Sequence, residues 1–173
     1  KYELHLEHGE RPWLSDDGYI DDADRSRGAI VSNLPAGSIY TTVLEDRTEG
    51  SLWVPKAGKA RDVVFHFCDG RVVEIEAAGG AAELAAELDR HSGEPRRVSH
   101  VGVGLNPYLT RSTGWTLVDE HISGNLFIAL GENRYMGGQN ESSINVDYVV
   151  PGTSLIVDEK TIISEGKLTS TGE

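Results

Sequence analysis

The chain has 173 residues, enough for one domain with a single buried core. Its formal net charge is −12 at pH 7, so a nucleic-acid partner and an anionic membrane surface are both disfavoured. The single cysteine, Cys68, excludes an internal disulfide and favours a reducing cytoplasm.

The first quarter of the chain predicts one strand followed by irregular structure. Apolar and polar residues alternate over residues 2–6, which is typical of a strand. The chain begins with neither a Met nor a signal-peptide pattern, and we expect it to be a fragment or a mature piece of a longer protein. The Asp- and Gly-rich segment 11–26 is interpreted as a loop. Residues 29–31 then lead into a turn at 33–37, which contains Pro and Gly.

The clearest local prediction is a β-hairpin. Residues 62–67 and 71–76 are rich in Val, Ile and Phe, and they flank Asp69-Gly70. Asp-Gly suits a type I′ turn, in which both central residues have positive φ. Residues 51–54 predict a further short strand.

One segment predicts a helix. Residues 80–90 consist mainly of Ala, Glu and Leu, with Leu84 and Leu88 on one face. The Ser-Gly-Glu-Pro sequence at 92–95 ends it.

The second half of the chain predicts strands. Residues 101–104 and 126–130 are short apolar runs, which we interpret as buried strands, and residues 143–150 alternate cleanly. Residues 154–157 and 161–163 are predicted to form a closing hairpin. The pattern as a whole predicts an α+β domain, rich in strands of mixed or antiparallel sheets, with few helices.

Two places in the sequence are candidates for a ligand site. His100 precedes a strand that contains Gly102 and Gly104, and glycines leave room for a ligand or a metal to approach the backbone. The alternative is a histidine that is satisfied within the core. Asn145 and Asp147 are two residues apart on a strand, so they share a face, which either meets solvent or lines a site.

No phosphate-binding loop, Cys-x-x-Cys, His-Glu-x-x-His or Gly-x-Ser-x-Gly motif is present, so the sequence gives no support for a serine nucleophile. The acidic turn at 45–50 is most simply solvated. Considered singly, most histidines are expected to be surface or half-buried residues: His5, His8, His66, His91 and His121.

Four blocks of sequence, in order, resemble the C-terminal domain of the aminopeptidase T-like metallopeptidases and of a related family, the 2,5-dihydroxypyridine 5,6-dioxygenases. The blocks are residues 33–37 with 45–50, 99–107, 119–131 and 137–147. The resemblance implies that residues 1–173 form one metal-binding domain, without the N-terminal domain that family members usually carry. It also implies a homo-oligomer.

The dioxygenase branch fits these blocks better than the aminopeptidase branch. The aminopeptidase pattern has a metal-binding His where Phe127 stands, and of its metal ligands Asp147 is the one that matches intact. The dioxygenase pattern Ser-His-x-Gly-x-Gly-Leu matches residues 99–105, and its Gly-Asn-x-Phe matches residues 124–127.

The dioxygenase resemblance implies a mononuclear iron(II) site with two His and one carboxylate. In this chain the implied metal ligands are His100 and Asp147, with Asn145 at the position of the second His. His121 or Glu49 is the residue expected to transfer protons.

Three hypotheses follow from the residues and the resemblance. The first is a mononuclear metal-dependent enzyme that resembles a ring-cleaving dioxygenase and acts on a small polar, N-heterocyclic substrate. Its cofactor would be Fe(II) or another divalent ion such as zinc, manganese or cobalt. The second is a metallo-aminopeptidase-like hydrolase with a reduced metal site. The third is a degenerate, non-catalytic domain for binding or assembly.

Overall fold

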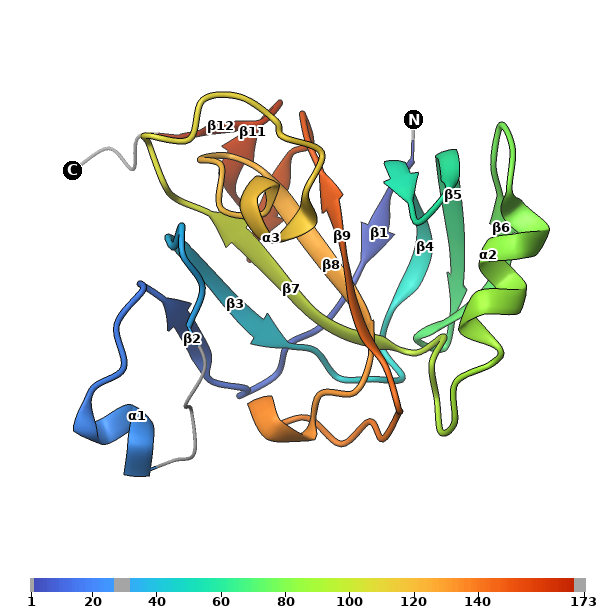
Figure 1. Cartoon of the computed structure of the whole chain (residues 1–173), viewed down its shortest axis with the longest axis horizontal. Coiled ribbons are helices and arrows are strands. Elements are labelled where there is room, and N and C mark those ends of the chain that lie inside the picture. The colour runs from blue at the N-terminus through green and yellow to red at the C-terminus, as the bar shows by residue number, and fades with distance from the viewer. Residues whose placement is uncertain (1, 27–31, 170–173) are drawn as a thin grey trace. The chain divides into compact units, whose positions relative to one another are not determined.

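The computed structural model describes residues 2–26 and 32–169 of the chain. Strands dominate this part, and the few helices are short (Figure 1), so the predicted α+β class is confirmed. The helices are α1 (Asp22–Ser26), α2 (Ala81–Leu88), α3 (Thr116–Asp119) and the 3-10 helix η1 (Arg134–Met136). The strands are β1 (Leu4–His5), β2 (Trp13–Asp16), β3 (Ser38–Thr42), β4 (Glu49–Ala57), β5 (Ala60–Cys68), β6 (Arg71–Glu76), β7 (Val98–Gly104), β8 (Leu126–Gly131), β9 (Asn145–Val150), β10 (Leu155–Val157), β11 (Lys160–Ser164) and β12 (Lys167–Leu168).

The strands form three sheets. One has the order β1-β4-β5-β6 and a second has the order β10-β11-β12, and in both of them neighbouring strands are antiparallel. The third has the order β2-β3-β7-β8-β9. Within the described residues, no helix is long and apolar enough to cross a membrane.

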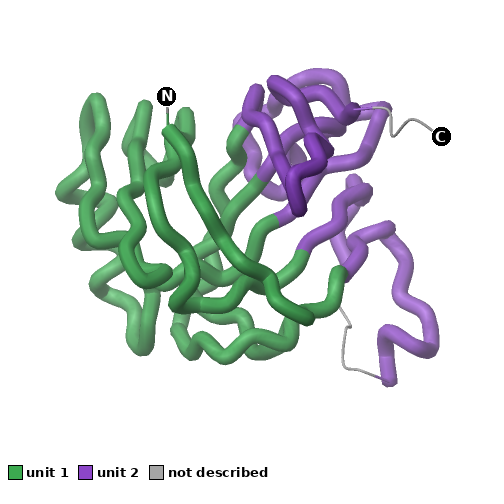
Figure 2. The backbone as a smooth tube through the Cα atoms, turned by 180° about the vertical axis from the view of Figure 1, so that it is seen from behind, with its two compact units in different colours: residues 1–13, 41–101, 127–150 green, residues 14–40, 102–126, 151–173 purple. Residues whose placement is uncertain are grey.

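The chain divides into two compact units, which Figure 2 colours separately. Unit 1 comprises residues 1–13, 41–101 and 127–150, and unit 2 comprises residues 14–40, 102–126 and 151–173. The core of unit 1 includes the fully buried Phe65, whose ring lies 4.9 Å from that of Tyr148.

The predicted hairpin and helix are both present in unit 1. Asp69 and Gly70 join β5 to β6 with φ of 49° and 72°, so both central residues are in the left-handed region, as a type I′ turn requires. Helix α2 packs against β5 and β6 (Figure 1) and buries Leu84 and Leu88. The predicted face of this helix is therefore the one that meets the sheet.

The prediction of a loop over residues 11–26 was wrong, because β2 and α1 lie within it. The acidic residues that suggested a loop cap the helix instead. Asp24 N donates to Asp21 Oδ1 at 2.8 Å, and Asp21 N donates to Asp24 Oδ2 at 2.9 Å. This reciprocal arrangement satisfies backbone donors as a capping box does. Residues 29–31, which were predicted to lead into the turn at 33–37, lie outside the described residues.

Strand lengths differ from the predicted ones. The opening strand is reduced to Leu4–His5, and the predicted 51–54 strand is the middle of the nine-residue β4. Backbone pairing of β4 with β5 continues from Gly50 to Ala57, past positions where Gly and Pro break the apolar pattern. The closing hairpin is present as β10 and β11.

Candidate metal centre

His100 on β7 and Asp147 on β9 meet inside unit 1. The imidazole Nε2 lies 2.9 Å from Asp147 Oδ1, and His100 is 5% exposed. Oδ1 is itself buried, yet it accepts no aligned hydrogen bond from any residue that the structure describes. The short distance therefore joins an imidazole nitrogen and a carboxylate oxygen that do not share a well-directed N–H···O bond. A pair of this kind needs a cation beside it, either a proton or a metal ion.

The separation of 2.9 Å is also the one that a metal ion imposes on two neighbouring ligands. Ligand atoms that subtend 90° at an ion, with bonds of ~2.1 Å, lie about 3.0 Å apart. The distance between the two side chains is therefore one that a shared cation would allow.

Ser99 sets the protonation of the imidazole. Its Oγ lies 3.0 Å from His100 Nδ1 and donates to the carbonyl oxygen of Glu132 at 3.1 Å. Because the single hydroxyl proton is used toward Glu132, Oγ can accept from Nδ1–H. The proton on Nδ1 leaves the Nε2 lone pair directed away from Ser99, as a metal-binding histidine requires.

Asn145, at the start of β9, is joined to the same network. Its Nδ2 donates to the carbonyl oxygen of Glu132 at 2.8 Å and to Ser99 Oγ at 3.1 Å. A carbonyl oxygen can only accept, so the amide nitrogen must be the atom that faces Glu132. This fixes the amide orientation and leaves Oδ1 as the atom of Asn145 with coordinating ability. Ser99 thus connects two of the predicted ligands, His100 and Asn145, and the third, Asp147, is joined through its contact with His100 Nε2.

Phe127 of β8 forms an apolar wall beside the histidine. Its ring packs edge-to-face on the His100 imidazole, with centroids 5.9 Å apart. The residue at the aminopeptidase's His position therefore restricts the imidazole and shields it from water, and it cannot bind a metal.

The expected space beside Gly104 is filled by the protein itself. A Cβ on Gly104 would lie 2.2 Å from the carbonyl oxygen of Ile122 and 2.5 Å from that of Glu120. A Cβ on Gly138 would meet the side chain of Asn133 at 2.1 Å. These two glycines admit neighbouring segments of the chain, which corrects the interpretation of Gly104 as room for a ligand.

Sequence reasoning missed the residues that support the pair. Asn133 is fully buried, and its Nδ2 donates to the carbonyl oxygen of Ser99 and to Glu45 Oε1, both at 3.0 Å. Glu45 lies 88 residues from Asn133 in sequence, so no local pattern reveals this contact. Ser99 could have been found, because it directly precedes His100.

Glu49 lies in a different setting. Its carboxylate, at the exposed start of β4, accepts a hydrogen bond from Asp69 N at 2.7 Å. Ligand atoms of Glu49, Cys68 and Asp69 lie within 4.8 Å of one another, and all three residues are exposed. Glu49 and Asp69 raise the pKa of the Cys68 thiol, which disfavours the thiolate form that metals bind. Proton transfer by Glu49 stays a prediction.

His121 belongs to unit 2, where it is 1% exposed. Its Nε2 lies 3.5 Å from Glu120 Oε1 and 3.9 Å from Asp16 Oδ2. Burial lowers the pKa of His121, and the Asp16 carboxylate opposes this shift, so the imidazole is neutral at neutral pH. Its predicted role in proton transfer is likewise untested.

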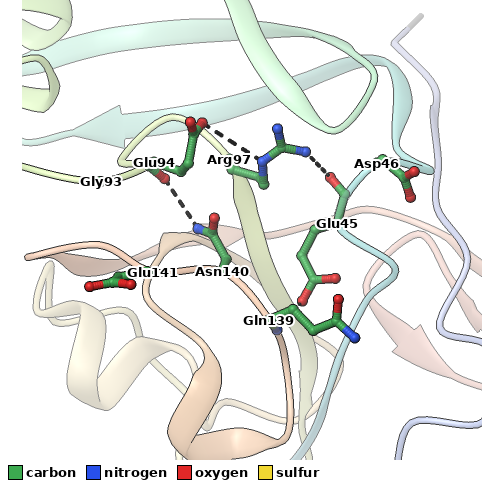
Figure 3. A pocket seen from close by; sticks show the side chains of 8 residues that line it. All are labelled: Glu45, Asp46, Gly93, Glu94, Arg97, Gln139, Asn140 and Glu141. Atoms are coloured by element: carbon green, nitrogen blue, oxygen red, sulfur yellow. Dashed lines mark hydrogen bonds and ion pairs between the residues drawn. The ribbon is translucent and has the colours of Figure 1, made fainter.

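A polar cavity of about 540 Å³ opens in unit 1 (Figure 3), and none of the predicted site residues lines it. Arg97 donates to the carbonyl oxygen of Glu45 at 3.1 Å, and Asn140 Nδ2 donates to that of Glu94 at 3.1 Å. These two donors are thus occupied by the protein. The lining residues are Glu45, Asp46, Gly93, Glu94, Arg97, Gln139, Asn140 and Glu141.

Fold and site together define a strand-rich α+β domain in which a buried histidine contacts a half-buried carboxylate. The family model described as 2,5-dihydroxypyridine 5,6-dioxygenase matches residues 3–170. The chain belongs to this family. A search of curated protein sequences found no match.

Two solved structures share the fold. The match to the structure of 2,5-dihydroxypyridine dioxygenase from Pseudomonas putida KT2440 covers 98% of this chain and 55% of the dioxygenase chain, with a TM-score of 0.71 and 18% identity. The match to wild-type AmpT from Thermus thermophilus covers 96% of this chain and 47% of the AmpT chain, with a TM-score of 0.69 and 22% identity. The chain therefore spans about half the length of these structures.

Proposed function

We propose that this domain holds one divalent metal ion, Fe(II) in the first instance, between His100 and Asp147, with Asn145 Oδ1 as a third ligand. The 2.9 Å approach of Nε2 to a buried Oδ1 that accepts no aligned hydrogen bond is the observation that supports this proposal most. One imidazole and one carboxylate with an oxygen donor suit a mononuclear site with open positions for a small substrate and oxygen.

The substrate proposed for this site is a small, polar, dihydroxylated N-heterocycle. The dioxygenase activity for which the family and the Pseudomonas putida protein are named supports this class. This chain's residues would hold the imidazole in one tautomer through Ser99 and exclude water from one side through Phe127.

Anaerobic titration with Fe(II) tests the metal site directly. We expect the chain to bind one ion, and His100→Ala to weaken binding by at least about 100-fold, because a ligand is lost. His5→Ala is the matched control, since His5 Nε2 lies 3.3 Å from Glu3 Oε1 in a pair that is about three-quarters exposed. Equal iron binding by His100→Ala and by the unaltered chain would contradict the proposal.

Activity measurements separate the three functions. Oxygen uptake by the iron-loaded chain with 2,5-dihydroxypyridine supports the dioxygenase. Peptide cleavage with added zinc or cobalt supports an aminopeptidase-like hydrolase, although Phe127 leaves that site without one of its ligands. Failure to bind any divalent ion leaves a non-catalytic domain for binding or assembly.

A further inference from the structure

A second group of reactive side chains lies on the first sheet of unit 1, outside the candidate metal centre. Ser51, His66 and Glu76 belong to the neighbouring strands β4, β5 and β6 (Figure 1). Ser51 Oγ lies 2.8 Å from His66 Nδ1, and His66 Nε2 lies 3.0 Å from Glu76 Oε1. A hydroxyl, an imidazole and a carboxylate in this order are the parts of a base-activated serine nucleophile.

The direction of the two hydrogen bonds follows from the chemistry of the three groups. An ionised carboxylate can only accept, so His66 Nε2 carries the proton that Glu76 accepts. In a neutral imidazole Nδ1 then has a lone pair, and the Ser51 hydroxyl donates to it. Ser51 therefore directs its proton at a base, which is the arrangement that a serine nucleophile needs.

Strand pairing holds the three groups in place. Ser51 and His66 are directly opposite each other in the β4–β5 register, so their side chains share one face of the sheet. Val64 pairs with Glu76 in the β5–β6 register, and it is two residues from His66, so Glu76 shares that face. A site on paired strands is held more precisely than a site on loops.

The three groups are accessible to a small molecule. The side chain of His66 is 29% exposed and that of Glu76 is 60% exposed, and Ser51 is half-buried. Trp53 is two residues from Ser51 on the same strand, so it lies on the same face, and it is also half-buried. Its indole offers an apolar surface on which an aromatic group of a substrate can pack.

Ser99, His100 and Asp147 have the same order of groups, but Ser99 is not available as a nucleophile. It is fully buried, and its hydroxyl proton is donated to the carbonyl oxygen of Glu132. Of the two groups, the one on the first sheet is therefore the one that a substrate can reach.

We propose that Ser51, His66 and Glu76 form an acyl-transfer site for activated aryl esters, with Ser51 as the nucleophile. Ser51 Oγ attacks the ester carbonyl carbon while its proton passes to His66 Nδ1, and Glu76 stabilises the imidazolium that forms. The bond from the carbonyl carbon to the aryl oxygen breaks, and the aryl oxide leaves with the electron pair. Since an aryl oxide such as 4-nitrophenolate is a weak base, it leaves without a proton from the protein, and the imidazolium releases its proton to solvent.

Water completes the reaction. It attacks the acyl group on Ser51 while His66 Nδ1 takes a proton from it, and that proton returns to Ser51 Oγ as the carboxylic acid leaves. The net reaction is hydrolysis of the ester to an aryl alcohol and a carboxylic acid, with water as the one co-reactant.

Hydrolysis of 4-nitrophenyl acetate by the full chain tests the site, with the release of 4-nitrophenolate followed by absorbance. Ser51→Ala and His66→Gln are each expected to lower the rate at least about tenfold, because the nucleophile or its base is lost. Ser143→Ala is the matched control and should keep the full rate. Ser143 Oγ also contacts an imidazole, at 3.2 Å from His91 Nδ1, but among the described residues no carboxylate lies within ion-pair distance of His91.

Covalent labelling of the unaltered chain locates the reacting oxygen and depends on no variant. A fluorophosphonate loses fluoride to an activated serine and leaves a stable adduct, which peptide mass spectrometry is expected to find on Ser51. The adduct should persist in Ser143→Ala and be absent from His66→Gln. An unchanged rate of ester hydrolysis in Ser51→Ala, or no adduct on Ser51 in the unaltered chain, would overturn the proposal and leave the three side chains as a polar contact between strands.

Discussion

At the scale of single residues, the hydroxyl group of Ser99 connects parts of the candidate metal centre. It contacts His100 Nδ1, Asn145 Nδ2 and the Glu132 carbonyl oxygen at 3.0–3.1 Å, which uses its one donor and both of its acceptor positions. Ser99 therefore joins two of the proposed ligands, His100 and Asn145. Its role is to position them.

Ser99→Ala is predicted to lower Fe(II) affinity by about 10–100-fold, because the imidazole loses the partner that fixes its tautomer. The variant should also lose about 1–3 kcal/mol of unfolding free energy, since His100 Nδ1 and Asn145 are left underpaired. Ser51→Ala is the matched control, because Ser51 Oγ makes a similar 2.8 Å contact with Nδ1 of His66 on the first sheet. A loss of stability without a loss of iron affinity would count against the positioning role.

The lowered pKa of His121 predicts that the stability of the chain depends on pH in a defined direction. Burial lowers the pKa of His121 below its unfolded value of 6.5. Just below pH 6.5, the unfolded chain therefore binds a proton at His121 that the folded chain does not bind. The stability contribution is thus present above pH ~6.5 and is lost as the pH falls toward the folded pKa. The groups facing the ring are the carboxylates of Asp16 and Glu120.

Urea unfolding of the metal-free chain at pH 7.5 and pH 5.5 measures this effect. The unaltered chain should lose more stability between the two values than His121→Gln, which has no titrating ring. An equal loss in both proteins would show that folding does not change the pKa of His121.

At the scale of elements, Gly104 decides how closely two segments approach. It ends β7, and the backbone of residues 120–122 packs directly over it. Position 104 requires a glycine, because a Cβ there would overlap two carbonyl oxygens of the neighbouring backbone.

Gly104→Ala is predicted to cost about 1–3 kcal/mol in unfolding free energy, because the 120–122 segment must move away. Gly79→Ala is the control, since a Cβ at Gly79 would meet nothing within 4 Å. Chemical denaturation of both variants measures the difference, and similar midpoints would show that the segment yields at little cost.

Elements defined by local chemistry were predicted well. The Asp69-Gly70 turn and the Leu84 and Leu88 face of α2 follow from positive φ and from helical periodicity, which depend on neighbouring residues. The lengths of β1 and β4 were not predicted, because pairing with another strand decides where a strand ends.

At the scale of the whole molecule, the candidate metal centre joins residues that are distant in sequence. His100 and Asp147 were predicted together from a family resemblance, and the structure brings them to 2.9 Å. The contacts of His121 with Asp16 and Glu120 were not predicted, because Asp16 lay in a segment interpreted as a loop. His100 and Asp147 lie within unit 1, and the family match extends over both units.

The sequence by itself determined the strand-rich class, the hairpin and the main helix, because these depend on residue type and local spacing. The candidate ligands came from the resemblance of four sequence blocks to a known family. Tertiary structure alone decided that Ser99 joins His100 to Asn145, that the Glu49 carboxylate accepts from Asp69 N, and that neither nitrogen of His121 has a hydrogen-bond partner among the described residues. Such contacts join residues up to 88 positions apart, as between Glu45 and Asn133. Their geometry follows from strand pairing and burial, which no short stretch of sequence encodes.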